Sequence, residues 1–268
     1  MSKEPHPHGT FCWAELATSD SAGAKEFYTG LFDWRAHDDD LPSGNTYTMF
    51  THQDGFVAAT YGLTEEMKEM GVPVHWLLYV SVEDARATAA QAAELGGTIV
   101  KDAFDVMEIG SMAVLQDPAG GTFAVWQPRA SRGTDHTDGK PHTVCWNELA
   151  SRDAVAAGDF YCELFGWTRQ SMESSAGTYT MFMNGDQRAA GMLQMTEEWG
   201  EIPSHWMMYL AVDDCDASAA RAAELGGDVC VPPTDIPPSG RFSVLGDPQG
   251  ATFSIIKMTE EPTTCVEK

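Results

Sequence analysis

Two stretches of the chain decide its fold, because the second repeats the first 133 residues later. They read Phe11-Cys-Trp-Ala-Glu-Leu-Ala17 and Val144-Cys-Trp-Asn-Glu-Leu-Ala150. Further matching pairs follow in the same order: Phe27-Tyr28 with Phe160-Tyr161, Tyr47-Thr-Met-Phe50 with Tyr179-Thr-Met-Phe182, His75-Trp76 with His205-Trp206, and Asp117-Pro118 with Asp247-Pro248. An ordered series of this length indicates a tandem duplication.

The duplication divides the 268 residues into two units of ordinary domain size. The first unit is expected to span residues 9–128 and the second residues 142–258, each with a core of its own. Residues 129–141 offer almost nothing to bury and are predicted to form a linker. The polar residues 1–8 are predicted to be a loose lead-in, and the residues after 258 a polar tail.

Each unit has the residue pattern of an α+β fold. In residues 10–17, alternation with a period of two puts Phe11, Trp13 and Glu15 on one face of a predicted strand. The remaining elements of the first unit are predicted to be helices at 21–31 and 83–95 and strands near Trp34 and at 47–52, 56–61, 75–82, 98–101, 111–116 and 121–127. Each repeat is therefore predicted to hold two β-α-β-β-β modules.

The charge of the chain restricts its partners. Its 40 acidic and 16 basic side chains give a formal charge of −24, which repels nucleic acids and anionic membrane surfaces. The same acidity is also typical of proteins that stay soluble in high salt. We expect neither nucleic acid nor membrane as a partner. The expected partner is a small-molecule ligand.

The cysteines and the apolar segments bear on the compartment. The six cysteines show no C-x-x-C spacing, so neither a zinc site nor a disulfide framework is indicated. There is no apolar run of a membrane helix and no apolar stretch of a secretion signal near the N-terminus. A cytoplasmic protein with reduced thiols is expected.

Three motifs make the chain resemble the vicinal oxygen chelate superfamily, which includes glyoxalase I, bleomycin-resistance proteins and extradiol dioxygenases. They are the Trp-x-Glu-Leu that opens each repeat, Asp20 and Asp153 ahead of Phe-Tyr-x-x-Leu-Phe-x-Trp, and the segment Gly240–Ala251. The chain looks most similar to two-domain glyoxalase-like proteins of the actinobacterial type. The resemblance implies a tandem pair of glyoxalase/bleomycin-resistance/dioxygenase domains, each built of two βαβββ modules whose sheet curls into a cup.

The resemblance also implies where a metal ligand would stand in metal-using relatives. Those positions hold Trp13 and Ala124 in the first repeat and Trp146 and Ser254 in the second. None of these side chains is a good ligand for a divalent metal that prefers carboxylate or imidazole donors. We therefore predict no metal and no other cofactor, with a divalent ion on a reduced ligand set as the alternative.

Polar residues remain on the predicted cup face of each repeat. Alternation places Glu15 beside Trp13 and gives His75 and Tyr79 a common face in the second module, which suggests that Glu15 lies opposite His75 across the cup. Glu148, His205 and Tyr209 occupy the matching places in the second repeat. Such groups are suited to general acid–base chemistry when burial tunes their pKa values. The alternative is a satisfied buried network that only fixes strand register.

Two functional hypotheses follow. The first is a protein that binds a small aromatic metabolite in a metal-free cup, as bleomycin-resistance proteins do. Its expected ligand contacts are Trp13, Tyr79, Trp126, Trp146, Tyr209 and Arg241. Arg241 is also consistent with a surface ion pair.

The second hypothesis is a glyoxalase-like lyase or isomerase, or an oxygenase, that uses Glu15 with His75 or Glu148 with His205, with or without a divalent metal. In either case the resemblance implies that the tandem arrangement replaces the homodimer of single-domain relatives. A monomer or a weak homodimer is therefore expected.

Overall fold

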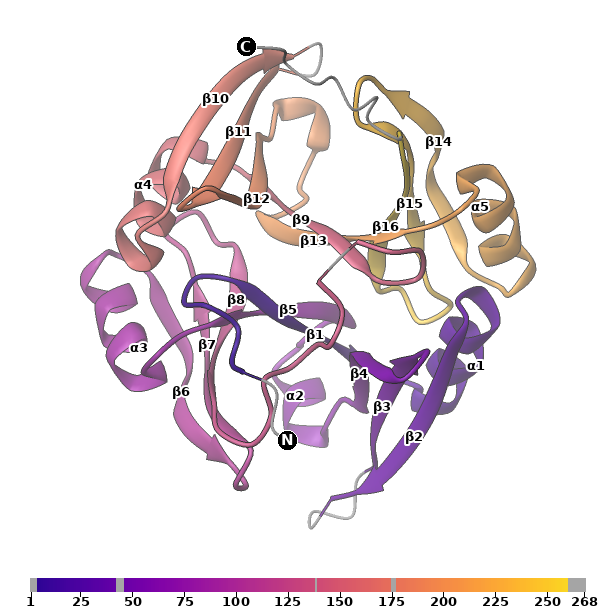
Figure 1. Ribbon diagram of the computed structural model, residues 1–268, viewed down its shortest axis with the longest axis horizontal. Coiled ribbons are helices and arrows are strands. Elements are labelled where there is room, and N and C mark those ends of the chain that lie inside the picture. Colours follow the sequence, from indigo (N-terminus) through magenta and orange to yellow (C-terminus); the bar gives the residue numbers. More distant parts are fainter. Residues whose placement is uncertain (1–3, 42–45, 138, 175–176, 260–268) are drawn as a thin grey trace.

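The computed structural model describes residues 4–41, 46–137, 139–174 and 177–259. Each repeat forms one eight-stranded mixed sheet, in the orders β2-β3-β4-β1-β5-β8-β7-β6 and β10-β11-β12-β9-β13-β16-β15-β14. Both sheets curl, and their concave faces open toward opposite ends of the molecule (Figure 1). The predicted α+β class and the tandem pair of βαβββ modules in each repeat are confirmed.

The elements of the first repeat follow the predicted order, with the short helix α2 in addition. They are β1 (Phe11–Thr18), α1 (Ser21–Leu31), β2 (Trp34–Asp40), β3 (Thr46–His52), β4 (Gly55–Gly62), α2 (Glu65–Glu69), β5 (His75–Ser81), α3 (Ala85–Glu94), β6 (Thr98–Val106), β7 (Gly110–Gln116) and β8 (Thr122–Pro128).

The second repeat has the same order of strands and long helices. Its elements are β9 (Val144–Ser151), α4 (Ala154–Phe165), β10 (Thr168–Ser174), β11 (Gly177–Asn184), β12 (Gln187–Gln194), the 3₁₀ turn η1 (Glu197–Trp199), β13 (His205–Ala211), α5 (Cys215–Glu224), β14 (Asp228–Ile236), β15 (Gly240–Gly246) and β16 (Thr252–Met258).

Capping aspartates fix where the helices start. The Asp20 side chain accepts hydrogen bonds from the backbone N–H groups of Ala22 and Gly23 at the first turn of α1. Asp84, Asp153 and Asp214 cap α3, α4 and α5 in the same way. Helix α1 then buries Ala24, Phe27 and Tyr28 on one face, as the spacing of its apolar residues predicted.

A β-bulge interrupts the predicted alternation at the start of β1. The register with β5 shifts between Phe11 and Trp13, so Cys12 is the extra residue. Phe11 therefore packs on the main core, whereas Cys12 and Trp13 both join the cluster on the concave face. The prediction that Phe11 shares a face with Trp13 is wrong for this reason. Beyond the bulge, Trp13 and Glu15 point to the concave side as predicted.

The two repeats share one core instead of having one each. A single cluster of buried residues runs through both sheets on their convex sides. The central strands β5 and β8 of the first sheet contact β13 and β16 of the second, and the long helices lie at two opposite sides of the molecule, with α1 next to α5 and α3 next to α4 (Figure 1). The Tyr28 hydroxyl of α1 donates to the Asp247 carboxylate of the second repeat over 3.0 Å, and Tyr161 of α4 donates to Asp117 of the first over 2.9 Å. The expectation of two separate cores is therefore wrong.

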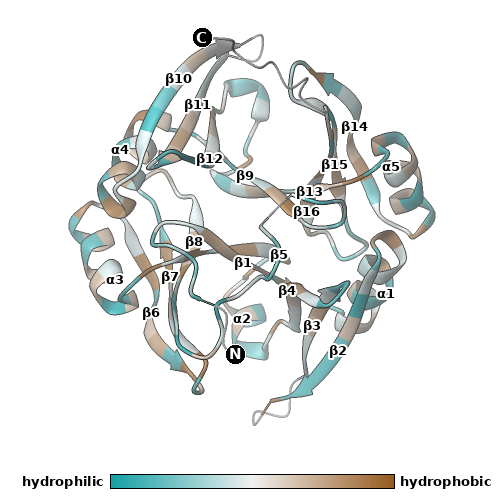
Figure 2. Ribbon diagram, viewed as in Figure 1, coloured by the Kyte–Doolittle hydropathy of each residue, from teal (hydrophilic) through white to brown (hydrophobic). Residues whose placement is uncertain are grey.

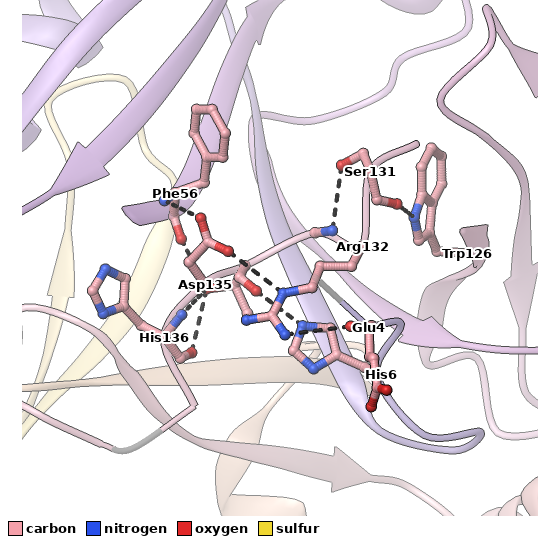
Figure 3. Close-up of polar contacts among 10 residues, drawn as sticks. Glu4, His6, Phe56, Trp126, Ser131, Arg132, Asp135 and His136 are labelled. Carbon is pink, nitrogen blue, oxygen red and sulfur yellow. Dashed lines mark hydrogen bonds and ion pairs between the residues drawn. The ribbon is translucent and has the colours of Figure 1, made fainter. Parts of the chain in front are cut away.

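The linker packs against the first repeat. The backbone N–H of Thr134 donates to the Cys12 carbonyl at the bulge over 2.7 Å, and that of Asp135 donates to the Phe56 carbonyl over 2.9 Å. The Trp126 indole N–H donates to the Ser131 carbonyl over 2.9 Å (Figure 3). Residues 131–136 are all half-buried. The sequence did not predict that this segment is held in a fixed position. Its composition is polar, and the backbone hydrogen bonds that hold it cannot be recognised from composition.

The lead-in is also fixed in place. The His6 side chain is buried and its Nε2 donates to the Thr134 carbonyl over 2.9 Å, while its own carbonyl accepts from the Ser81 hydroxyl. Arg132 reaches the Glu4 carbonyl from the linker (Figure 3). The prediction of a loose lead-in is wrong for residues 4–8. The predicted polar tail lies outside the described residues apart from Thr259.

One edge strand of each sheet is polar. Figure 2 shows β2 and β10 as largely hydrophilic, in keeping with the acidic residues of β2. Charged edges hinder pairing with a further strand. In the described part of the chain, each helix is too short or too polar to cross a bilayer.

Candidate functional site

The candidate site is the concave face of each sheet, which we call cup 1 in the first repeat and cup 2 in the second. In cup 1, buried Leu77, Tyr79, Ala124 and Trp126 form a cluster, and half-buried Trp13 packs on it. This cluster is separate from the core between the sheets. The strands thus have an apolar convex side that holds the fold together and an aromatic concave side that carries a second, smaller cluster.

Glu15 lies in the centre of cup 1 and is held by phenols. The Tyr79 hydroxyl donates to Glu15 Oε2 over 2.5 Å, and a weaker hydrogen-bonding influence comes from Tyr47. The Trp13 indole N–H in turn donates to the Tyr47 hydroxyl over 3.4 Å. Desolvation raises the pKa of Glu15 above its ordinary value, and the two tyrosines lower it in part.

Cup 2 repeats this arrangement. The Tyr209 hydroxyl donates to Glu148 Oε1 over 2.8 Å, and the Trp146 indole N–H donates to the Tyr179 hydroxyl over 3.0 Å. Desolvation raises the pKa of Glu148, against the hydrogen-bonding influence of Tyr209 and Tyr179. Burial also raises the pKa of Tyr209, so its phenol stays a donor. A Trp–Tyr–Glu–Tyr network is therefore present once in each repeat.

The sequence analysis missed Tyr47 and Tyr179 as members of this network. Both open the Tyr-Thr-Met-Phe segment that occurs in each repeat. They reach the glutamates from β3 and β11, two strands away from β1 and β9. The presence of this tyrosine in both repeats could have indicated a functional role. Its closeness to the glutamate could not be predicted, because it depends on the order of strands in the sheet.

His75 and His205 do not belong to the networks. The register places Glu15 opposite Leu77, so that His75 and Tyr79 are both diagonal neighbours of the carboxylate. Tyr79 makes the contact, while the His75 imidazole is turned to the Pro73 carbonyl at 2.8 Å. His205 makes the same contact with Pro203. The predicted Glu15–His75 and Glu148–His205 pairs are therefore wrong.

Arg241 and Trp126 have other partners than a ligand. Arg241 forms ion pairs with Asp216 of α5 at 2.7 Å and with Asp235 at 2.9 Å, on the face of β15 opposite to the cup. The prediction that Arg241 contacts the ligand is wrong, and its alternative, a surface ion pair, holds. Trp126 does lie in cup 1, but its indole N–H is engaged by the Ser131 carbonyl.

The cups differ at several matched positions. In the order cup 1 to cup 2 these include Ala59 to Gly191, Tyr61 to Leu193, Leu77 to Met207, Met112 to Phe242, Ala124 to Ser254 and Trp126 to Ile256. A Cβ at Gly191 would collide with the Tyr179 hydroxyl unless that ring shifted. The change to serine adds a hydroxyl, and the others alter the shape of the cup.

The residues of the cups do not fit a divalent metal. The positions that hold ligands in metal-using relatives are Trp13 and Ala124 in cup 1 and Trp146 and Ser254 in cup 2. Across the described ranges, no three His, Cys, Asp or Glu side chains come together as a metal site would require. The central carboxylates, Glu15 and Glu148, are already engaged by tyrosine hydroxyls.

Two shallow grooves lie elsewhere on the surface. One, of about 340 Å³, runs between α3 and α4 over Leu95, Pro118 and Phe160, and the other, of about 390 Å³, lies along the lead-in. Neither gathers a buried polar network like that of the cups. A carboxylate with a raised pKa beside phenols and aromatic faces is the arrangement that can bind a polar aromatic molecule or move a proton.

Both repeats match models of known protein families. Residues 136–255 match the glyoxalase/bleomycin resistance protein/dioxygenase superfamily, and residues 13–126 match the glyoxalase-like domain. The inferred glyoxylase CFP32 of Mycobacterium tuberculosis is 38% identical over 257 residues, which are 95% of this chain and 97% of that protein. The anthracycline biosynthesis protein DnrV of Streptomyces peucetius is 35% identical over 264 residues, 94% of either chain.

Solved structures share the fold at low identity. A Mn(II)-bound glyoxalase from Novosphingobium aromaticivorans superposes with a TM-score of 0.65 at 15% identity and covers 93% of this chain and 82% of its own. The 2,3-dioxygenase LapB from Pseudomonas sp. KL28 has a TM-score of 0.62 at 11% identity, covering 96% and 95%. Given this fold and the relatives that match along both repeats, the chain belongs to the glyoxalase/bleomycin resistance protein/dioxygenase superfamily, as its motifs predicted.

Proposed function

We propose that this protein binds a small aromatic molecule with a hydrogen-bond donor, such as a phenol or an aromatic amine, on the concave face of a cup. The observation that carries the proposal is the Trp–Tyr–Glu–Tyr network, which both repeats hold on the concave face. Glu15 and Glu148 are half-buried there, whereas the convex faces are closed by apolar packing. The presence of the same network on both concave faces, with the glutamates partly exposed, supports a ligand-binding role.

The chemistry of the network selects the ligand class. Tryptophan and tyrosine faces favour a flat apolar body. Among the described residues, tyrosine hydroxyls rather than a basic side chain act on the two carboxylates. The carboxylates therefore favour a ligand that donates a hydrogen bond. With a formal charge of −24 on the whole chain, anionic ligands are disfavoured at long range as well.

A catalytic role for the same groups is the second candidate. Desolvation raises the pKa values of Glu15 and Glu148, which moves each carboxylate toward the range of a general base. Tyr79 and Tyr209 would then position the carboxylate as hydrogen-bond donors, because burial raises their pKa values. The names of the relatives, a glyoxylase and an anthracycline biosynthesis protein, are compatible with either role.

Binding is tested with two probes that share one ring system. 1-Naphthol has a donor hydroxyl, and 1-naphthoate has an anionic carboxylate in its place. We expect 1-naphthol to raise the melting temperature as its concentration increases, since a ligand that binds only the native state stabilises it. 1-Naphthoate is expected to have no such effect. Equal shifts with both probes, or none with either, would count against the proposal.

The glutamates are tested by Glu15→Gln, Glu148→Gln and the double variant. Glutamine preserves the shape but removes the charge, so we expect the double variant to bind 1-naphthol about tenfold more weakly or worse, with little change in melting temperature. Unchanged affinity would show that the network is structural. Loss of turnover with intact binding, once a substrate is found, would favour the catalytic candidate.

A further inference from the structure

The buried Ser254 hydroxyl of β16 has no partner in the described structure. Its side chain is completely buried, and its Oγ makes no hydrogen bond within the residues described. Ser254 exerts a hydrogen-bonding influence that lowers the pKa of Tyr209 against the effect of burial, but the two hydroxyls are not paired in a hydrogen bond of good geometry. Buried hydroxyls are usually paired, because leaving one without a partner costs free energy. The hydroxyl therefore calls for a partner that is not part of the chain.

The register places this hydroxyl in cup 2. Tyr209 of β13 pairs with Ser254 in the parallel ladder. The neighbours Phe253 and Ile255 belong to the core between the sheets, so the Ser254 side chain points to the opposite, concave face. There it lies at the floor of the cup, next to the Tyr209–Glu148 contact.

The matched position in cup 1 shows that the fold does not need the hydroxyl. Ala124 occupies the same place in β8, pairs with Tyr79 in the same way and is completely buried. Strand pairing and packing at this position are thus satisfied by a methyl group. The hydroxyl of Ser254 therefore adds an unpaired polar atom to cup 2 that the fold does not need.

Other matched positions give cup 2 more room. Leu193 replaces Tyr61, and Ile256 replaces Trp126, the residue whose indole N–H the linker engages in cup 1. Phe242, in the place of Met112, adds bulk, and it brings a further aromatic ring to 6.3 Å from that of Tyr209.

We propose that cup 2 is the tighter ligand site and that Ser254 recognises a phenolic hydroxyl there. The ligand hydroxyl donates to Glu148 and accepts from Ser254 Oγ, while the aromatic body lies among Trp146, Tyr209 and Phe242. This assignment rests on the proposed function and adds to it the site, the specificity-determining residue and the ligand group. Cup 1, with Ala124 in place of the serine, binds the same ligand more weakly.

The test uses the full chain with Ser254→Ala and, as the matched control, Ala124→Ser. The probes are 1-naphthol and naphthalene, which lacks the oxygen that would accept from Ser254, and dissociation constants come from calorimetric titration. We expect Ser254→Ala to weaken 1-naphthol binding about tenfold, as for the loss of one hydrogen bond, and to leave the weak binding of naphthalene unchanged. Ala124→Ser is expected to leave the tight site unaltered.

Stability provides the second readout. Without ligand, Ser254→Ala should melt at the same or a higher temperature, because it removes an unpaired buried hydroxyl. A lower melting temperature, or unchanged 1-naphthol affinity, would overturn the assignment of Ser254. If Glu148→Gln weakens binding while Ser254→Ala does not, this inference fails and the proposed function stands. If the wild-type chain binds neither probe, both fail.

Discussion

Two opposing effects set the pKa of Glu15, namely desolvation by burial and the hydrogen bond from Tyr79. Tyr79 donates the 2.5 Å hydrogen bond that lowers the pKa of Glu15 against the larger effect of desolvation. We predict that Tyr79→Phe raises the pKa of Glu15 further, because the charged form loses its best donor while the cavity stays apolar. The measurement is a pH titration of the Glu15 side-chain carbon by ¹³C NMR.

A neighbouring tyrosine supplies the control. Tyr61 lies near the same carboxylate, but the causes that shift the pKa of Glu15 do not include a hydrogen bond from it. Tyr61→Phe should therefore leave the titration of Glu15 where it is in the wild-type protein. A similar shift in both variants would show that bulk polarity, and not the Tyr79 hydrogen bond, controls the carboxylate.

The residues of the network were only partly predictable from the sequence. Alternation along β1 and β5 was sufficient to place Trp13, Glu15 and Tyr79 on one face, because period two is a local property of a strand. The choice between His75 and Tyr79 as the partner of Glu15 was not local. It depends on the antiparallel register, in which both are diagonal neighbours, and on the Pro73 carbonyl that holds the His75 ring.

At the scale of elements, the linker is a packed segment whose backbone depends on glycine. Gly133 has a φ of +96°, and a Cβ there would collide with the carbonyl oxygen of Cys12. Gly139 has a φ of +63°, but its nearest neighbours are 3.5 Å away. Both glycines use the left-handed region, and only the first makes a close approach.

This contrast gives a prediction with its own control. We expect Gly133→Ala to lower the free energy of unfolding by about 2 kcal/mol or more, since strain and a clash with backbone combine. Gly139→Ala should cost about 1 kcal/mol from the backbone conformation alone. Chemical denaturation measures both. Equal losses would mean that the linker does not hold its place on β1.

The lead-in makes stability depend on pH through His6. Burial lowers the pKa of His6 below its ordinary value of 6.5, an effect that nearby Arg132 reinforces and that Asp135 and the Thr134 carbonyl oppose. The folded state therefore disfavours the protonated ring. The unfolded chain takes up this proton first as the pH falls through 6.5, so the stabilisation from His6 is present above that pH and declines below it.

We therefore predict that the melting temperature of the wild-type protein falls more steeply from pH 7.5 to 5.5 than that of His6→Gln. Glutamine still offers an N–H to the Thr134 carbonyl but does not titrate. The raised pKa values of Glu15 and Glu148 act in the opposite direction, and they are common to both proteins, so the difference between the two curves isolates His6. Parallel curves would contradict the buried, neutral state of this ring.

At the scale of the whole molecule, the repeats hold one another in a reciprocal way. Trp34 of the first repeat donates to the His142 carbonyl at the start of the second, and Trp167 of the second donates to the Gly9 carbonyl at the start of the first. The sequence predicted the duplication but not this exchange, because a repeat pattern does not say which face of one copy meets the other. The chain contains its own pseudo-twofold interface, and a monomer or a weak homodimer remains our prediction.

The same reciprocity predicts how the protein unfolds. The Tyr28 hydroxyl donates to Asp247 and accepts from the Trp76 indole N–H over 2.9 Å, all within the shared core. Tyr28→Phe keeps the ring but leaves a buried carboxylate oxygen and an indole N–H without their partner. We expect a loss of about 1–3 kcal/mol in the free energy of unfolding, in line with unpaired buried groups.

The cooperativity of unfolding shows whether the two repeats unfold together as one unit. Because Tyr28 and Asp247 belong to different repeats, Tyr28→Phe should weaken both at once, and unfolding should stay a single transition seen alike by far-UV circular dichroism and tryptophan fluorescence. Tyr161→Phe, which breaks the matching contact with Asp117, should behave in the same way. If either variant instead shows two transitions, with one repeat melting before the other, the continuous cluster does not couple the repeats, and each would have to be treated as a domain that folds on its own.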